Sequence, residues 1–402
     1  MKANKVTSLE IDQYSKNIKL YYLYTFLKHF IFFGGVLIPF FTVWGEIKFS
    51  EVMILQTIFT ISIFLFEIPT GALADHLGRK SSMILGGITT AGGFLLYTIV
   101  PNFYLFALGE VIIALGFSLT SGADQALLYD SLKKLKQEQK SKKIFARAQT
   151  ICFTSGMIAA PLGSIIAKIF GLRTIMLFTA IPIFLSVIVA ANLKEPKHQS
   201  NKNKETYTQK IKSGLKYFQR NKILKEITFD YVPIAALAFF LVWVYQIILQ
   251  NLNISIELFG FVHAAIFAVE IILLANLSRV EKFFGGKKKY LKFSAIICGL
   301  GFISLAFITN AAVAIVVILV IAALGLTRKT IYINYLNKHI ESKIRATVLS
   351  LISMIYALTQ TLSNLIFGKM VDYNLHLTLF LVGTFILAFV FLSNLKEQNL
   401  LE

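Results

Sequence analysis

Apolar stretches of helix length recur along the chain, and short polar segments separate them. A helix that crosses a bilayer needs about 20 predominantly apolar residues. Twelve stretches approach that length, so the pattern predicts an all-α membrane protein with twelve transmembrane helices. The predicted spans are 20–41, 52–74, 82–100, 103–128, 146–168, 174–193, 227–249, 255–277, 291–308, 311–336, 346–367 and 374–394.

The longest polar stretch covers residues 194–226 and divides the chain into two sets of six spans. The pattern therefore predicts an N-terminal six-helix bundle over 1–193 and a C-terminal one over 227–402. Within the linker, apolar residues recur at helical spacing between lysines, which is typical of an interfacial amphipathic helix. We interpret this segment as a solvated cytoplasmic linker with one surface helix; a regulatory or partner-binding role is the alternative.

Composition supports a membrane protein, because 56% of the residues are hydrophobic and only 15% are charged. A soluble enzyme would be about a quarter charged. The net charge is +19, and most of the 40 Lys and Arg residues fall in the termini and the even-numbered loops. Basic loops mark the cytoplasmic side. We therefore expect both termini in the cytoplasm, in the plasma (inner) membrane, and no nucleic-acid partner.

The two halves resemble each other weakly. The segment FLFEIPTGALAD (64–75) aligns without gaps on FAVEIILLANLS (267–278), and this alignment matches Glu67 with Glu270. A basic segment that contains glycine follows each of them. A six-plus-six repeat implies two bundles around a cavity at the membrane midplane, with access alternating as one bundle rocks against the other.

The loop after the second span reads GALADHLGRK from Gly71 to Lys80. It resembles the signature G-x-L-a-D-r-x-G-R-k between helices 2 and 3 of the major facilitator superfamily. The resemblance implies the fold of that family, secondary transport and a cytoplasmic gating latch. The latch residues would be Gly71, Asp75, Gly78, Arg79 and Lys80.

Residue types in this loop agree with a latch. Glycines allow a tight turn and close helix approach. The carboxylate of Asp75 would be attracted to the N-terminus of the eleventh helix, at residues 343–347.

A second, partial resemblance lies in the fifth span, where Gly156 to Gly163 read GMIAAPLG. This segment looks like the g-x-x-x-G-P-x-x-G-G motif of the drug/proton antiporters in the same superfamily, with Ala160 in place of a glycine. Small residues beside a proline are also common in ordinary helix packing. The fourth helix lacks the R-x-x-Q-G element of those antiporters, and the first helix carries Lys28 in place of their acidic residue.

Ionisable residues inside predicted spans are costly and are therefore candidate functional groups. Counting from the inner ends of their spans places Lys28 and Glu67 at equal depth, which predicts an ion pair. Glu67 could exchange a proton, or the pair could be structural. Asp124 lies on a face of small and polar residues that suits a cavity wall, and Arg147 is its expected partner.

Two further acidic residues are candidates for proton coupling. Glu110 lies about seven residues from the outer end of its span, where it could accept an external proton or simply face a wet vestibule. Glu270 is the repeat counterpart of Glu67.

Candidate residues for a substrate cavity lie in the seventh and tenth spans. Arg328 could snorkel to the inner surface, or it could face the cavity beside Tyr332 and favour anionic groups. Trp243, Tyr245 and Gln246 offer stacking and hydrogen bonds as pocket walls. Residues of this kind also form belts at the membrane interface.

No nucleotide-binding P-loop, HExxH zinc motif or G-x-S-x-G elbow occurs in the sequence. We therefore expect no enzyme, no cofactor and no metal site. The favoured hypothesis is a monomeric secondary transporter that exports small organic or amphipathic compounds in exchange for protons. The alternative is a proton-coupled importer or uniporter of a small anion-bearing solute, favoured by Lys28, Arg328 and Lys329.

Overall fold

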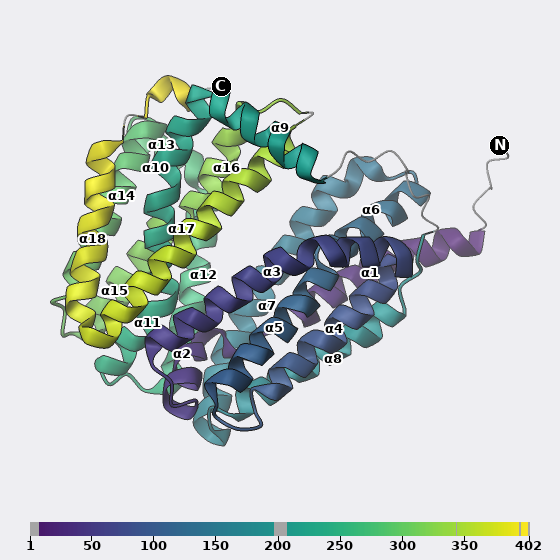
Figure 1. Cartoon of the computed structure of the whole chain (residues 1–402), viewed down its shortest axis with the longest axis horizontal. Helices are drawn as coiled ribbons and strands as arrows, with labels where there is room; N and C mark the ends of the chain where they lie inside the picture. Colours follow the sequence, from purple (N-terminus) through teal and green to yellow (C-terminus); the bar gives the residue numbers. More distant parts are fainter. Residues whose placement is uncertain (1–7, 197–206, 343, 394, 401–402) are drawn as a thin grey trace. The chain divides into compact units, whose positions relative to one another are not determined.

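The computed structural model describes residues 8–196, 207–342, 344–393 and 395–400, and all its regular elements there are helices (Figure 1). The chain forms two compact units. The first comprises Met1–Ile47, Ile54–Asn201 and Ser255–Ala264. The second comprises Lys48–Met53, Lys202–Ile254 and Ala265–Glu402.

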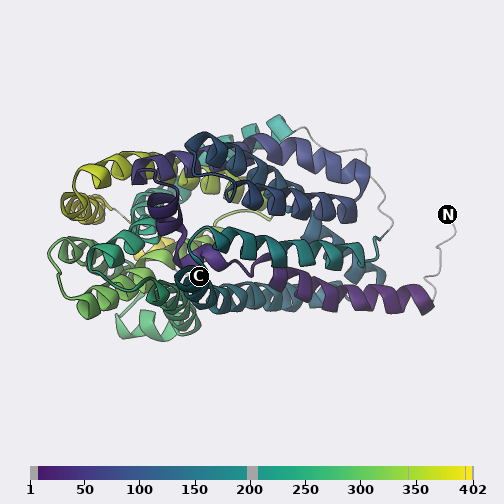
Figure 2. The same cartoon turned by 90° about the horizontal axis from the view of Figure 1, so that it is seen from below.

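Helices in the first half of the chain follow the first six predicted spans. The first span is bent by 66°. Within each unit the long helices run alongside one another (Figures 1 and 2). The elements are α1 (Ser8–Lys28), η1 (Phe32–Gly35), α2 (Leu37–Pro39), η2 (Phe40–Trp44), α3 (Phe49–Leu77), α4 (Arg79–Leu96), α5 (Phe103–Thr120), α6 (Ala123–Lys134), η3 (Glu138–Lys140), α7 (Ser141–Phe170) and α8 (Thr174–Ala191).

The second half begins with the predicted surface helix of the linker, α9, and continues with the remaining six spans. The elements are α9 (Tyr207–Arg220), α10 (Lys222–Phe239), α11 (Leu241–Asn251), η4 (Ile256–Leu258), α12 (Phe259–Ala275), α13 (Leu277–Phe283), α14 (Lys287–Leu305), α15 (Ala311–Ile321), η5 (Ala322–Leu326), α16 (Arg328–Lys338), α17 (Arg345–Tyr373), α18 (Leu375–Leu392) and η6 (Glu397–Asn399).

By length and apolar character alone, nine helices among the described residues could cross a membrane, or ten with the bent first span. The other two predicted spans are α4 and α14, whose first turns carry basic residues. Both pack inside their units, α4 against α5 and α8, and α14 against α15 and α18. With these two, the all-α fold with twelve transmembrane helices that the sequence predicts is confirmed.

Glycines allow these two helices to approach their neighbours closely. A Cβ atom added at Gly116 of α5 would come within 2.7 Å of the carbonyl oxygen of Gly86 on α4. In the second unit, a Cβ atom at Gly383 of α18 would come within 2.4 Å of the carbonyl oxygen of Gly299 on α14. Small residues at such contacts let transmembrane helices pack backbone to backbone.

In the part of the chain that the structure describes, asparagine caps the start of four helices. The side chains of Asn102, Asn221, Asn310 and Asn374 accept hydrogen bonds from backbone N–H groups in the first turns of α5, α10, α15 and α18. Each cap satisfies donors that have no partner inside the helix. The caps therefore fix where these spans begin.

The fourth and tenth predicted spans, which correspond in the two halves, are both interrupted. The fourth span breaks at Gly122, whose φ of +73° separates α5 from α6. The tenth span passes through the π-helical segment η5 between α15 and α16. Irregular backbone inside a membrane is tolerated where protein buries it or where it lines a cavity.

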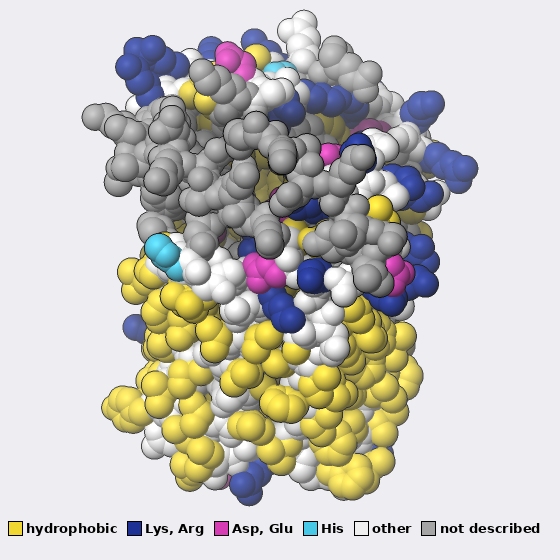
Figure 3. Space-filling view, turned by 90° about the vertical axis from the view of Figure 1, so that its right-hand side faces the viewer, with side chains coloured by type: hydrophobic (Ala, Val, Ile, Leu, Met, Phe, Trp, Pro, Cys, Tyr) yellow, Lys and Arg dark blue, Asp and Glu magenta, His cyan; other side chains and the backbone are white. Residues whose placement is uncertain are grey.

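Large apolar side chains are exposed on the helices, with 66% of Leu65 and 65% of Ile169 accessible. Figure 3 shows hydrophobic side chains over the lower part of one face and Lys and Arg side chains toward its upper part. Such a surface fits lipid around its apolar band and water at its basic end.

Candidate functional site

A cavity of about 360 Å³ lies inside the first unit. Residues of α1, of the break between α5 and α6, and of α7 surround it. The lining combines an ion pair, amide and hydroxyl groups, and aromatic rings. The lining residues are Tyr21, Thr25, Lys28, His29, Phe117, Thr120, Ser121, Gly122, Asp124, Gln125, Phe145, Ala148, Gln149 and Cys152.

Lys28 and Asp124 form the ion pair in this cavity, with 3.1 Å between Nζ and Oδ2. Their side chains are 18% and 14% exposed. The Lys28 ammonium group also lies 5.6 Å from the ring centroid of Tyr24. Asp124 stands in the first turn of α6, where the helix dipole favours a carboxylate. The break at Gly122 creates that helix start in the middle of the span.

The predicted pairing of these charges is wrong in two respects. Lys28 pairs with Asp124 and not with Glu67, which is exposed on α3. Arg147 is also exposed, and its guanidinium group lies 5.4 Å from the ring centroid of Tyr22 instead of pairing with Asp124. Counting residues along a span gives depth, but it does not give the direction in which a side chain points.

Glu110 lies buried inside the first unit, with 5% of its surface exposed. Its Oε1 accepts a hydrogen bond of 3.0 Å from the Nε2 of Gln56 on α3. The prediction that it faces a wet vestibule is therefore wrong. A carboxyl group in this setting has a neutral amide partner, so it differs from Asp124, which faces an ammonium group.

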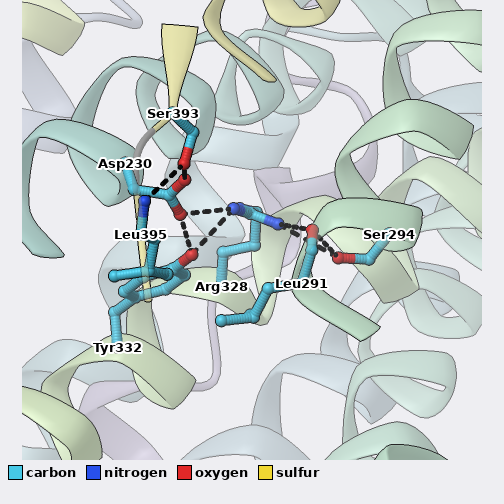
Figure 4. A network of polar contacts seen from close by, with 7 residues as sticks. All are labelled: Asp230, Leu291, Ser294, Arg328, Tyr332, Ser393 and Leu395. Carbon is cyan, nitrogen blue, oxygen red and sulfur yellow. Dashed lines mark hydrogen bonds and ion pairs between the residues drawn. The ribbon is translucent and has the colours of Figure 1, made fainter. Parts of the chain in front are cut away.

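Arg328 lies at the centre of a polar network in the second unit (Figure 4). Only 1% of its surface is exposed. Its Nη1 donates to the carbonyl oxygen of Leu291 at 2.9 Å and to the Oγ of Ser294 at 3.0 Å. Its Nη2 donates to the Tyr332 hydroxyl at 3.1 Å and lies 3.5 Å from Asp230 Oδ2.

Asp230 receives further hydrogen bonds in that network, from the hydroxyl groups of Tyr332 and Ser393. The carboxylate of Asp230 therefore balances the positive charge of Arg328 in the protein interior. The prediction that Arg328 snorkels to the inner surface is wrong. Its neighbour Lys329 is exposed, with its ammonium group 4.9 Å from the ring centroid of Tyr356.

The aromatic and amide candidates of the seventh span lie on α11. Tyr245 and Gln246 are buried, and the Nε2 of Gln246 donates to the Tyr245 hydroxyl at 3.1 Å. Trp243 is partly exposed. The interface belt is therefore the wrong interpretation for Tyr245 and Gln246. Glu270 is partly exposed on α12.

The predicted latch residues surround the turn between α3 and α4, where Gly78 has a φ of +91°. The backbone N–H groups of Arg79 and Lys80 donate to the carboxylate of Glu195, which follows α8. The Arg79 guanidinium group donates to the carbonyl oxygen of Ala126 at 2.6 Å and pairs with Asp130 on α6. Gly71 is exposed on α3. The side chain of Asp75, and Lys343, lie outside the described residues.

The second unit repeats this arrangement. After Gly286, with a φ of +132°, the N–H groups of Lys287 and Lys288 each donate to the Glu397 carboxylate at 3.0 Å. Neither capping glutamate is among the functional residues predicted from the sequence. The sequence does indicate that the two glutamates have the same role, because the tetrapeptide Asn-Leu-Lys-Glu occurs at 192–195 and again at 394–397.

Among the described residues, no group of three or more His, Cys, Asp and Glu side chains is placed to hold a metal ion. The side chains that line the first cavity offer ion pairing, hydrogen bonding and aromatic contact.

Comparisons with known proteins place this geometry in context. The family model described as Major Facilitator Superfamily matches residues 23–357. The chain is 31% identical over 150 residues to an uncharacterized transporter of Buchnera aphidicola subsp. Schizaphis graminum, which covers 37% of each chain. It is 29% identical over 161 residues to the multi-drug resistance efflux pump PmrA of Streptococcus pneumoniae, 39% of this chain and 38% of that protein.

These matched stretches span about two fifths of the length of the curated relatives. The crystal structure of the nucleoside transporter NupG superposes over 96% of this chain and 100% of that one, with a TM-score of 0.79 and 14% sequence identity. At that identity the likeness concerns the fold.

Proposed function

Because the chain belongs to the Major Facilitator Superfamily, a family of secondary transporters, we propose that it exports small organic or amphipathic compounds in exchange for protons. It would work by alternating access in the plasma (inner) membrane, with both termini in the cytoplasm. The cavity of about 360 Å³ that contains the Lys28–Asp124 pair is the observation that supports this proposal most directly.

The cavity lining suits an amphipathic organic solute. Tyr21, Phe117 and Phe145 supply aromatic surface, while Gln125 and Gln149 supply amide donors and acceptors. Binding sites for small molecules combine largely apolar walls with a few polar groups that fix orientation. The similarity to a protein named as a multi-drug resistance efflux pump favours export and this class of solute.

Asp124 is the first candidate for proton coupling. An ionisable group at membrane depth is costly without a partner, and Lys28 supplies that partner. Proton binding to the Asp124 carboxylate removes the attraction that holds Lys28. The ammonium group then becomes available to solute or water, so protonation and solute occupancy become linked at one site.

Glu110 is the second candidate, because its carboxyl group is buried beside the neutral amide of Gln56. It would carry the proton through the first unit independently of the Lys28–Asp124 pair. Glu67 and Glu270, which are matched in the repeat, complete the set of proposed carriers. In this proposal the turn from Gly71 to Lys80 acts as the cytoplasmic gating latch.

The second candidate function is proton-coupled import, or uniport, of a small anion-bearing solute. The positive charge of Lys28 in the cavity wall favours binding of an anionic group, and hence this second candidate. Arg328 adds little, since Asp230 already balances its charge and Arg328 does not line this cavity. Because Asp124 balances the positive charge of Lys28, the cavity favours the first candidate over an anion-bearing solute.

Transport into proteoliposomes under an imposed pH gradient tests the proposal. Ethidium serves as an amphipathic cationic probe and benzenesulfonate, which stays ionised, as an anionic one, with an internal pH-sensitive dye to follow protons. Ethidium movement opposite to the proton flux supports the antiporter. Benzenesulfonate movement together with protons, or solute flux that ignores the pH gradient, contradicts it in favour of the second candidate.

A further inference from the structure

A second, smaller cavity of about 90 Å³ lies in the second unit beside the Arg328 network. Its volume is several times the roughly 10–15 Å³ that one water molecule needs. Three basic side chains line it, those of Lys288, Lys292 and Arg328, together with one acidic side chain, that of Asp230. These residues come from α14, α16 and α10.

The charges of the side chains that line this cavity do not sum to zero. Asp230 compensates Arg328, which lies 3.5 Å away. Lys288 and Lys292 stand one helical turn apart on α14, and both are exposed. In addition, the Nε of Arg328 is buried and has no hydrogen-bond partner among the described residues. A buried donor without a partner is uncommon in proteins, and two extra positive charges favour an anionic ligand.

The remaining lining is apolar apart from Ser393 and is formed by Ile234, Leu291, Ala295, Val390 and Leu395. Large apolar side chains beside these positions are exposed: Phe293 to 41%, Phe391 to 80% and Leu392 to 59%. Basic residues next to exposed apolar ones are typical of the boundary between lipid and water. The lining residues and their sequence neighbours therefore combine the residue types of a membrane interface.

We propose that this cavity binds the phosphodiester head group of an anionic phospholipid. The phosphodiester lies between the ammonium groups of Lys288 and Lys292, near the buried guanidinium group of Arg328. The glycerol and the first methylene groups cover the apolar wall. Free phosphate would meet the same cations but would leave that wall exposed, so we assign the lipid. The Asp230–Arg328 network positions the site, because it fixes α10 and α16 against α14.

A lipid titration of the purified full-length protein in neutral detergent tests this assignment. Thermal unfolding is followed while dioleoylphosphatidylglycerol, dioleoylphosphatidylcholine or inorganic phosphate is added. The test variant is Lys288→Gln/Lys292→Gln. The matched control is Lys282→Gln/Lys289→Gln, which removes the same charge from exposed lysines that do not line the cavity.

We expect phosphatidylglycerol to raise the unfolding temperature of the wild type and of the control pair. Each lysine near an anionic lipid changes affinity roughly fivefold, so the test variant, which lacks two lysines, should need about 25-fold more phosphatidylglycerol for the same shift. Equal responses of the test and control variants would overturn the site. An equal effect of phosphatidylcholine would overturn the anionic head group, and reproduction of the shift by inorganic phosphate alone would overturn the lipid.

Discussion

The ammonium group of Lys28 on α1 lies 3.1 Å from the carboxylate of Asp124 on α6. This pair joins the first and fourth predicted spans at the wall of the larger cavity. Ninety-five residues separate the two positions in the sequence, and the contact depends on the helix start that Gly122 creates within the fourth span. The proposed proton coupling rests on this relationship.

Asp124→Asn should abolish transport driven by a pH gradient and leave solute exchange partly intact, because the amide cannot bind and release the proton. It also leaves Lys28 without its counter-ion. Removing one partner of a buried pair costs about 3 kcal/mol, and the partial exposure of these side chains lowers that figure. Gradient-driven accumulation and solute counterflow in proteoliposomes measure the two effects separately.

The double variant Lys28→Met/Asp124→Asn separates coupling from folding. It should recover thermal stability, since no unpaired charge remains, but it should not recover driven transport. Asp12→Asn, at an exposed ion pair on α1, serves as the matched control. Recovery of driven transport in the double variant would mean that the pair is structural.

Glu110→Gln should keep the packing around Gln56, because glutamine has nearly the shape of glutamate. If the carboxyl group carries a proton, the variant should lose the dependence of transport rate on external pH while its affinity for the solute stays within about twofold, a difference of less than 1 kcal/mol. Initial rates across an external pH series measure this. A pH profile that matches the wild type would assign Glu110 a packing role.

The apolar pattern was sufficient to predict the membrane fold, because the length of a span is set by bilayer thickness. It also located α4 and α14, although basic first turns and internal glycines make these two helices less apolar than the others. Breaks inside spans were harder to predict. A single Gly122 ends α5, whereas other glycines, such as Gly86, stay inside their helices because they face a neighbouring backbone.

The partners of buried charges could not be predicted from the sequence. Counting along the predicted spans gives Lys28 and Glu67 equal depth, yet Lys28 on α1 points toward Asp124. Arg328 likewise pairs with Asp230 from another span, and no local pattern connects the two. Helix packing decides such contacts. By contrast, the capping role of Glu195 and Glu397 was accessible through the repeated Asn-Leu-Lys-Glu segment, since equal segments at the ends of equal halves predict equal contacts.

Glu195→Ala and Glu397→Ala should each destabilise the protein by about 0.5–2 kcal/mol, the range found for lost helix caps. Each substitution leaves two backbone N–H groups at the start of α4 or α14 without their acceptor. The two sites share no partner and lie in separate units, so the effects should add. Thermal unfolding in detergent measures them. Unchanged stability in both variants would show that water accepts the hydrogen bonds of these N–H groups as well as the carboxylates do.

Gly93→Ala should destabilise the protein by about 1–3 kcal/mol through overpacking. A Cβ atom there would come within 2.5 Å of Cγ1 and 3.1 Å of the backbone nitrogen of Ile113 on α5. The neighbouring Gly92 is the matched control, because a Cβ atom added to it meets nothing within 4 Å. Gly92→Ala should be neutral, or stabilising by up to about 1 kcal/mol through helix propensity. Equal unfolding temperatures of the two variants would contradict the packing of α4 on α5.

Accessibility of single cysteines tests the proposed orientation. In a background without Cys152 and Cys298, Tyr104→Cys and Phe283→Cys introduce thiols at positions that are 80% and 84% exposed. Tyr104 follows an odd-numbered loop and Phe283 lies in an even-numbered basic loop, so the positive-inside rule places them on opposite sides. A membrane-impermeant maleimide should label Tyr104→Cys in intact cells and Phe283→Cys only after permeabilisation. The reverse pattern would move both termini to the outside and would exclude the proposed cytoplasmic latch at Arg79 and Lys80.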